Sequence, residues 1–130
     1  MVTTPDVELE RGDLFDPNCS TRWLVDRIGS KWVSMIVKVL AEEPSVEVRF
    51  AALRRRTPGI SQKMLSQTLR TLERDGLVTR RVEPTVPPRV HYALTPLGHS
   101  LEARLAVLRD WAEEHMRAVG DARAAYDAAP

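Results

Sequence analysis

The chain has one cysteine in 130 residues, so no disulfide can form within it. No apolar run is long enough to cross a bilayer. The first residues, MVTTPDVELERGD, have neither the basic start nor the apolar stretch of a secretory signal peptide. These absences argue against a secreted or membrane-bound protein. We therefore expect a cytoplasmic protein with no membrane partner.

The signatures of an enzyme are also missing. Three histidines, His91, His99 and His115, stand apart, without H-E-x-x-H or paired-cysteine spacing. No glycine-rich phosphate loop follows a strand-like segment. A thiol hydrolase built on Cys19 and a distant histidine is the alternative, but no cleft-forming architecture supports it. We expect no catalytic residues, no metal and no cofactor.

The net charge is only +1, but the charge is unevenly distributed. Residues 49–91 carry ten basic and three acidic side chains, a formal charge of +7. Residues 1–16 carry five acids and one arginine, a charge of −4. A basic middle with an acidic start favours a surface that binds a polyanion. The alternative is a solvated basic face with no partner.

The segment 60–76 (ISQKMLSQTLRTLERDG) predicts the most informative helix of the chain. Ser61 is a suitable N-cap, and Gly76 stands where a left-handed residue ends a helix. The face expected to point inward carries Met64, Leu65, Thr68, Leu69 and Leu72, and the outward face carries Gln62, Lys63, Ser66, Gln67, Arg70 and Arg74. An ordinary amphipathic surface helix is one interpretation. Because Gln, Ser and Arg side chains can read base edges, a DNA-recognition helix is the other.

The preceding segments favour the second interpretation. Residues 31–42 are almost wholly apolar and predict a central core helix. Residues 46–49 suggest a short edge strand, and 50–56 a short helix that ends in Arg54, Arg55 and Arg56. A turn, Thr57-Pro58-Gly59, then leads into the helix at 60–76. A helix, a short turn with glycine and a second helix form a helix-turn-helix.

A hairpin follows the predicted recognition helix. Residues 77–83 and 89–94 are strand-like, and the prolines between them predict a stiff tip. Arg80 or Arg81, together with Arg89, would flank that tip. A basic hairpin directly after a recognition helix is typical of a winged helix, in which the wing contacts the DNA backbone.

The two ends of the chain suggest a dimer. Residues 21–28 predict a short helix that carries Trp23, and a helix from Pro96 to about Val119 is longer than the domain needs. Apolar residues recur along the second helix at Leu101, Leu105, Leu108 and Trp111. We expect Trp23 and these four residues to form a dimer interface; packing within one chain is the alternative.

The expected fold is therefore mainly α with a small β-wing (α+β), a winged helix-turn-helix dimerised through its terminal helices. Residues 1–17 form an acidic flexible arm, 18–94 the DNA-binding domain, 95–119 the dimerisation helix and 120–130 a flexible tail.

From Cys19 to about Met116 the chain resembles the HxlR-type family of bacterial winged-helix transcription regulators. The matching pieces are IGSKW at 28–32, RFAALRRRTPGISQKMLSQTLRTLERDGLVTR at 49–80 and VPPRVHYALTPLG at 86–98. The resemblance implies a homodimer on double-stranded operator DNA near a promoter. We expect a repressor rather than an activator. Lys31 and His91, which lie in or beside these pieces, join the arginines as expected contacts to the DNA backbone.

Cys19 stands at the family's N-terminal cysteine position, where the thiol of several members senses electrophiles or oxidants. The resemblance therefore suggests a switch at Cys19. A thiol at a helix N-terminus is favoured as thiolate, and Arg22 adds positive charge. The alternatives are a packing residue without chemistry, a regulator of non-covalent ligands, or a dimeric protein-interaction module without DNA readout.

Overall fold

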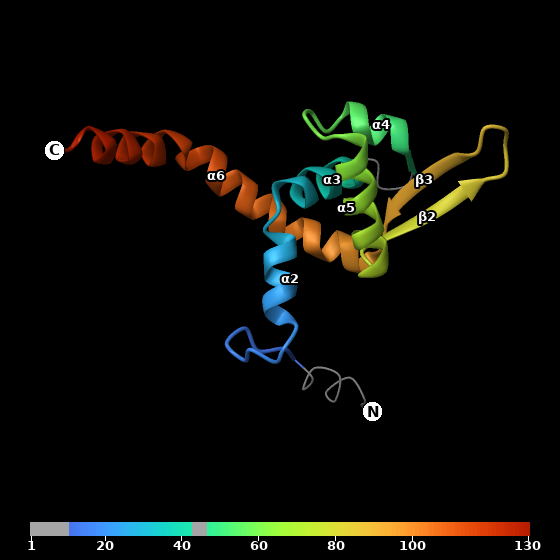
Figure 1. Cartoon of the computed structure of the whole chain (residues 1–130), viewed down its shortest axis with the longest axis horizontal. Coiled ribbons are helices and arrows are strands. Elements are labelled where there is room, and N and C mark those ends of the chain that lie inside the picture. The colour runs from blue at the N-terminus through green and yellow to red at the C-terminus, as the bar shows by residue number, and fades with distance from the viewer. Residues whose placement is uncertain (1–10, 43–46) are drawn as a thin grey trace.

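The computed structural model describes residues 11–42 and 47–130. In this part of the chain there are five helices and a three-stranded antiparallel sheet, and the β2–β3 hairpin projects from the helices (Figure 1). The elements are α2 Thr21–Ile28, α3 Lys31–Glu42, β1 Val48–Arg49, α4 Phe50–Arg55, α5 Gln62–Arg74, β2 Val78–Glu83, β3 Arg89–Leu94 and α6 Pro96–Ala128. The predicted order of a helix-turn-helix followed by a wing is confirmed.

The core forms around α3, the helix with the most apolar sequence. Its inward side chains are buried together with leucines of α4 and α5 and with Tyr92 of β3; the α3 members are Val33, Ile36, Val37, Val39 and Leu40. The Ser30 hydroxyl accepts a hydrogen bond from the Trp32 N–H at 3.2 Å and so caps α3. Burying this stripe fixes α4 and α5 on one side of α3.

The sheet has the strand order β1-β3-β2. Tyr92 of β3 lies opposite Val48 of β1 and Arg80 of β2, while His91 lies opposite Arg49 and Arg81. Because neighbours in register share a face and successive residues alternate, Arg80 and Arg81 point to opposite faces of the wing.

The start of α6 is joined closely to the end of α5. Gly76 has φ +76°, the left-handed conformation expected after the helix. Thr95 donates a hydrogen bond to the Gly76 carbonyl at 2.7 Å and caps α6 by accepting one from the Gly98 N–H at 3.0 Å. A Cβ at Gly98 would lie 2.1 Å from the Leu77 carbonyl oxygen, so only glycine fits there.

Helix α6 extends to Ala128, past the end predicted at Val119. Gly120 alone does not stop it, because the alanines and charged residues that follow have high helix propensity. Residues 120–128 are therefore helical rather than a frayed tail, and the distal half of α6 projects away from the wing (Figure 1). Within the described ranges, no helix has both the length and the apolarity needed to cross a membrane.

The expected flexible arm lies partly outside the described residues, which begin at Arg11. Residues 11–17 differ from the expectation because they form turns. The Asp13 carboxylate accepts a hydrogen bond from the Phe15 N–H at 3.0 Å, and the Asp16 carboxylate accepts one from the Asn18 N–H at 2.9 Å. Such local bonds stabilise turns before a helix. Residues 43–46, which include the first residue of the expected edge strand at 46–49, also lie outside the described residues.

Candidate nucleic-acid interface

The outward face of α5 is as polar as the sequence predicted. Gln62, Lys63, Gln67, Arg70 and Arg74 are exposed, and Ser66 is half-buried. Within residues 11–42 and 47–130, no ion pair or hydrogen bond engages the side-chain nitrogens and oxygens of these residues. The face therefore presents free donors and acceptors to solvent, as a base-reading helix requires.

The opposite face of α5 holds the helix on the core. Leu65, Leu69 and Leu72 are buried, and the Ser61 hydroxyl accepts a hydrogen bond from the Met64 N–H at 3.0 Å, which confirms the predicted N-cap. The prediction is wrong for Met64, which is 39% exposed. Met64 lies at the edge of the inward arc, beyond the reach of the residues that cover the leucines.

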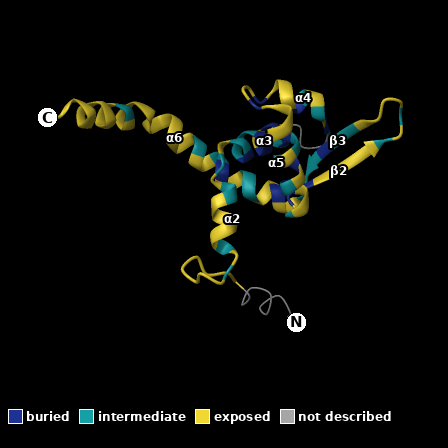
Figure 2. Ribbon diagram, in the orientation of Figure 1, coloured by how far each residue is buried: buried dark blue, intermediate teal, exposed yellow. Residues whose placement is uncertain are grey.

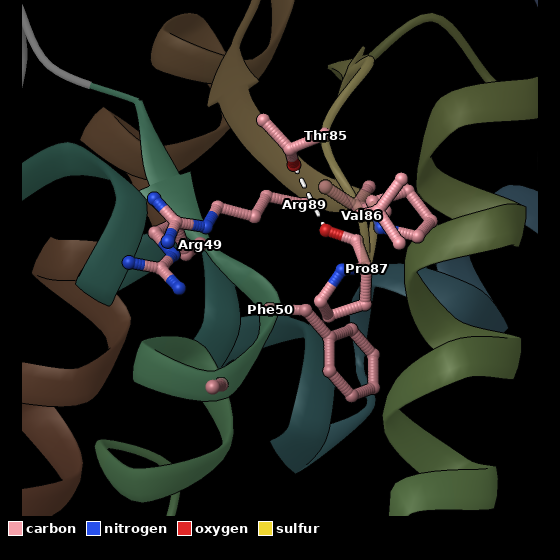
Figure 3. A pocket seen from close by; sticks show the side chains of 9 residues that line it. Arg49, Phe50, Thr85, Val86, Pro87 and Arg89 are labelled. Carbon is pink, nitrogen blue, oxygen red and sulfur yellow. Dashed lines mark hydrogen bonds between the residues drawn. The ribbon is translucent and has the colours of Figure 1, made fainter.

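Three hollows meet at Phe50, the first residue of α4. One lies against the wing tip and is lined by Arg49 and Arg89, with a volume of about 460 Å³ (Figure 3). A second lies beside α4, is lined by Arg54, Arg55 and Gln62, and measures about 590 Å³. A third, of about 390 Å³, lies between α5 and the wing.

The third hollow joins the helix to the wing. Ser66, Arg70 and Glu73 of α5 face Arg80 of β2 across it, with Tyr92 among the other lining residues. We call the three hollows together the basic concave surface; its charged side chains are Arg49, Arg54, Arg55, Arg70, Arg80, Arg89 and Glu73. Arg49 and Phe50 do not stand out in the sequence pattern, because their place at the interface depends on the sheet register and on the meeting of three elements.

In the structure Arg80 and Arg81 lie on opposite faces of the wing, a difference that the sequence pattern does not show. Arg80 lines the hollow toward α5. The Arg81 guanidinium on the other face donates to both carboxylate oxygens of Glu47, at 2.8 and 3.0 Å from Nε. This bond lowers the pKa of Glu47 below its usual value, so the pair is ionised at neutral pH. Arg81 is therefore not a free cation like Arg80.

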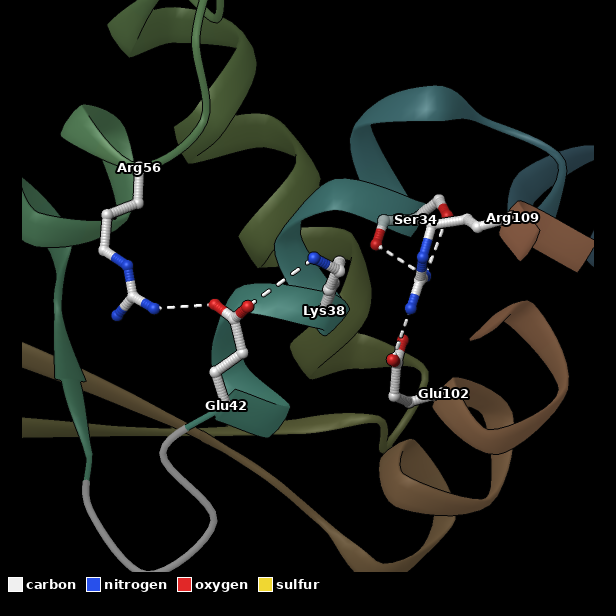
Figure 4. A network of polar contacts seen from close by, with 6 residues as sticks. All are labelled: Ser34, Lys38, Glu42, Arg56, Glu102 and Arg109. Atoms are coloured by element: carbon white, nitrogen blue, oxygen red, sulfur yellow. Dashed lines mark hydrogen bonds and ion pairs between the residues drawn. The ribbon is translucent and has the colours of Figure 1, made fainter. Parts of the chain in front are cut away.

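Two further basic residues expected at the DNA backbone also have partners within the chain. Arg56 forms an ion pair with Glu42 at 2.7 Å, and Lys38 contacts the same carboxylate (Figure 4). His91 lies 2.9 Å from a carboxylate oxygen of Glu83. That contact lowers the pKa of the Glu83 carboxyl. Glu42 and Glu83 thus reduce the positive field at these positions.

Lys31 lies at the start of α3 with its ammonium group 4.7 Å from the centre of the Trp32 ring. This side chain is exposed, and none of the three hollows includes it. Arg89, by contrast, lies at the wing tip beside the turn in which Thr85 donates to the Pro87 carbonyl at 2.8 Å (Figure 3). Of the predicted backbone contacts, Arg54, Arg55, Arg80 and Arg89 therefore line the three hollows that meet at Phe50.

Cys19 precedes α2 and is half-buried. Its sulfur lies 3.1 Å from the Thr21 hydroxyl and accepts a hydrogen bond from the Asp13 N–H at 3.4 Å. The Thr21 hydroxyl, followed by the Asp13 N–H, lowers the pKa of the Cys19 thiol. Arg22, expected to supply positive charge, instead donates to the Leu14 and Phe15 carbonyls.

The residues expected at a dimer interface fall into two groups. Trp23, Leu108 and Trp111 are exposed, whereas Leu105 is only 6% exposed and belongs to the core of its own chain. The prediction is therefore wrong for Leu105. Leu101 also packs against this core, because the first turns of α6 cover α3. Figure 2 shows that exposed residues dominate α2 and the distal half of α6.

Arg109 fixes the direction in which α6 leaves the core. Its guanidinium donates to the Ser34 hydroxyl at 3.0 Å and to the Ser34 carbonyl at 3.1 Å, and it pairs with Glu102 (Figure 4). The exposed stripe from Leu108 onward comprises Leu108, Trp111, Met116, Val119 and Tyr126. These residues share one side of the helix at 100° per residue.

Comparison with known proteins agrees with this geometry. The model of the HxlR-like helix-turn-helix family matches residues 27–119. An HTH-type transcriptional regulator of Escherichia coli K12, YtfH, is 41% identical over 121 residues, which cover 91% of this chain and 94% of YtfH.

Two solved structures share both fold and sequence. The putative transcriptional regulator ytfH from Salmonella typhimurium has a TM-score of 0.79 and 39% identity, covering 87% of this chain and 98% of its own. The redox regulator HypR in its reduced form has a TM-score of 0.68 and 35% identity, covering 77% and 96%. Such proteins are DNA-binding transcriptional regulators rather than enzymes. The chain therefore belongs to the HxlR-like helix-turn-helix family of transcriptional regulators.

Proposed function

We propose that two copies of this chain bind a pseudo-palindromic operator and repress transcription by occupying it. In each copy the outward face of α5 enters the major groove, where Gln62, Gln67 and Arg70 contact base edges. Lys63, Ser66 and Arg74 complete this contact with the groove and its flanking phosphates. The observation that carries the proposal is the exposed, unengaged polar face of α5 beside a hollow lined by Arg70 and Arg80.

The basic concave surface supports contact with the DNA backbone. Arg80 continues the surface of α5 across the third hollow, and Arg89 extends it to the wing tip. Arg54 and Arg55 lie beside Gln62 on the other side of α5. Phosphate contacts of this kind fix the position of a recognition helix without reading the sequence.

The exposed apolar stripe of α6 supports the dimer. Trp111 is 54% exposed, and the stripe continues to Tyr126 on a helix that projects from the domain. Trp23 and Leu24 of α2 are exposed as well. Pairing these surfaces between two copies would remove them from water and place two α5 helices in the two-fold arrangement that a palindromic operator needs.

A thiol switch at Cys19 is a second part of the proposal. The Thr21 hydroxyl and the Asp13 N–H favour the thiolate, which is the reactive form. The similarity of this chain to HypR, a redox regulator, supports this role. A small disulfide would react by exchange: Cys19 Sγ forms a mixed disulfide, and the other half leaves as a thiolate.

Salt-dependent binding of duplex DNA tests the proposal. Each phosphate contact contributes about −0.9 to the slope of log affinity against log salt, so six contacts give a slope near −5. A comparably steep slope, measured by fluorescence anisotropy, is the expected result. A protein that binds no duplex, or binds it with a flat salt response, would instead be the interaction module that the sequence left as the alternative.

A further inference from the structure

Three basic side chains form one row across the wing. The register places Arg49 of β1 opposite His91 of β3, and His91 opposite Arg81 of β2. Residues in register share a face of the sheet, so the row crosses all three strands on the face opposite Arg80. Arg89 stands on the same face, two positions along β3 from His91. The row therefore continues the basic lining of the wing-tip hollow, which contains Arg49 and Arg89.

Two carboxylates neutralise most of this row. Glu47 binds Arg81 through both oxygens, with a further contact of 2.7 Å to Arg81 NH2. Glu83 faces His91 at 2.9 Å. Glu47 lies just before β1 and Arg81 lies on β2, so their bond spans the central strand β3. Neither carboxylate lines the basic concave surface.

The Glu47–Arg81 pair neutralises the charge of Arg81 but is expected to stabilise the fold of the wing only slightly. Both side chains are well exposed, at 35% and 53%. An exposed ion pair stabilises a fold only slightly, because water screens the attraction. The pair nevertheless occupies the guanidinium, and a two-oxygen carboxylate matches the geometry by which Arg binds a phosphate.

We propose that Glu47 is a specificity-determining residue, which occupies Arg81 and so keeps this face of the wing from adding a sequence-independent phosphate contact. The inference rests on the proposed function, since it concerns how tightly the wing binds DNA. A phosphate contact strengthens binding to all sequences alike, so an extra one would reduce the preference for the operator over other DNA.

The test is the anisotropy of a labelled duplex of random sequence, titrated with wild type and with Glu47→Gln over a fourfold range of salt. Releasing Arg81 should tighten binding and steepen the salt slope by about 0.9. The ratio of variant to wild-type affinity then grows about 3.5-fold from the highest to the lowest salt. Preference for the operator over the random duplex should fall in the variant.

Two further variants test whether tighter binding comes from the released Arg81 side chain or from the change in net charge. Glu47→Gln/Arg81→Gln should return affinity and slope to those of the wild type, because the added contact is lost. Glu113→Gln makes the same charge change on α6, away from the wing, and should leave the slope unchanged. Thermal unfolding followed by circular dichroism should show that all variants are folded.

Several results would overturn the inference. Weaker binding of the duplex by Glu47→Gln would mean that the ion pair stabilises the wing in the conformation that binds DNA. Unchanged binding would mean that Arg81 does not reach DNA. A double variant as tight as Glu47→Gln would show that the gain does not come from Arg81, because its net charge equals that of the wild type. An equal gain in Glu113→Gln would assign it to net charge. If the wild type binds no duplex, both the proposed function and this inference fail. If the wild type binds duplex DNA and Glu47→Gln binds it with the same affinity and salt slope, only this inference fails.

Discussion

Arg70 of α5 and Arg80 of β2 line the same hollow, one from the recognition helix and one from the wing. Glu73 is the acidic side chain that lines the same hollow. This arrangement joins two surfaces with different tasks, because α5 offers amides and guanidinium groups to base edges while the wing offers guanidinium groups to phosphates. The first two predictions separate these tasks.

Gln67→Ala should weaken binding to the operator by about 1–3 kcal/mol, since a bidentate amide contact to a base is lost. Binding to a random duplex should change little, because Gln67 carries no charge. Competition anisotropy with both duplexes measures the difference. Equal losses on the two duplexes would contradict base reading by this residue.

Arg89→Ala should weaken binding to every duplex by a similar factor and reduce the salt slope by about 0.9. The reason is that Arg89 lies at the wing tip beside Arg49, where it can reach a phosphate. Arg117→Ala on α6 removes the same charge outside the basic concave surface and on the side opposite the exposed stripe, and serves as the control. A loss confined to the operator would assign Arg89 to base reading instead.

Trp111→Asp should dissociate the dimer, because it places a carboxylate in the exposed apolar stripe of α6. Operator affinity should fall with it, since one chain occupies only one half-site. Sedimentation velocity measures the assembly. Ala124→Asp adds the same charge on the opposite side of α6 and should remain dimeric; a dimer that survives Trp111→Asp would place the interface elsewhere.

Cys19→Ser should abolish the release of operator DNA by a small disulfide, because no thiolate remains to exchange. Release is measured by anisotropy with and without the disulfide. Release that persists in the variant would exclude Cys19 as the sensor, since the chain has no other cysteine.

The reactivity of Cys19 should also depend on Thr21. Because the folded protein lowers the pKa of the thiol, its alkylation by iodoacetamide should reach half its maximal rate at a lower pH than in the urea-unfolded chain. Thr21→Val removes the largest cause and should move that midpoint upward. An unchanged midpoint would show that the Thr21 hydroxyl does not favour the thiolate.

Much of the fold follows from local patterns in the sequence. The spacing of Leu65, Leu69 and Leu72, the Ser61 cap and the left-handed Gly76 define α5 without reference to the rest of the chain. The end of α6 was not predictable in this way, because Gly120 weakens a helix without ending it when favourable residues follow.

The candidate interface was only partly predictable, because charge partners depend on tertiary structure. Arg80 and Arg81 are equivalent in a sequence pattern, and only the sheet register sends one to α5 and the other to Glu47. The Arg56–Glu42 pair likewise joins two helices. For Leu105, the periodicity predicts an apolar stripe along α6. It does not show which part of that stripe is buried against the core of the same chain.

The most direct test of the central claim is selection of bound sequences from a pool of random duplexes. If two copies present α5 to one duplex, the selected sequences should contain two inverted half-sites with centres about 10 base pairs, or a multiple of that, apart. Enrichment of a single half-site without a symmetric partner, or no enrichment over the starting pool, would contradict the account.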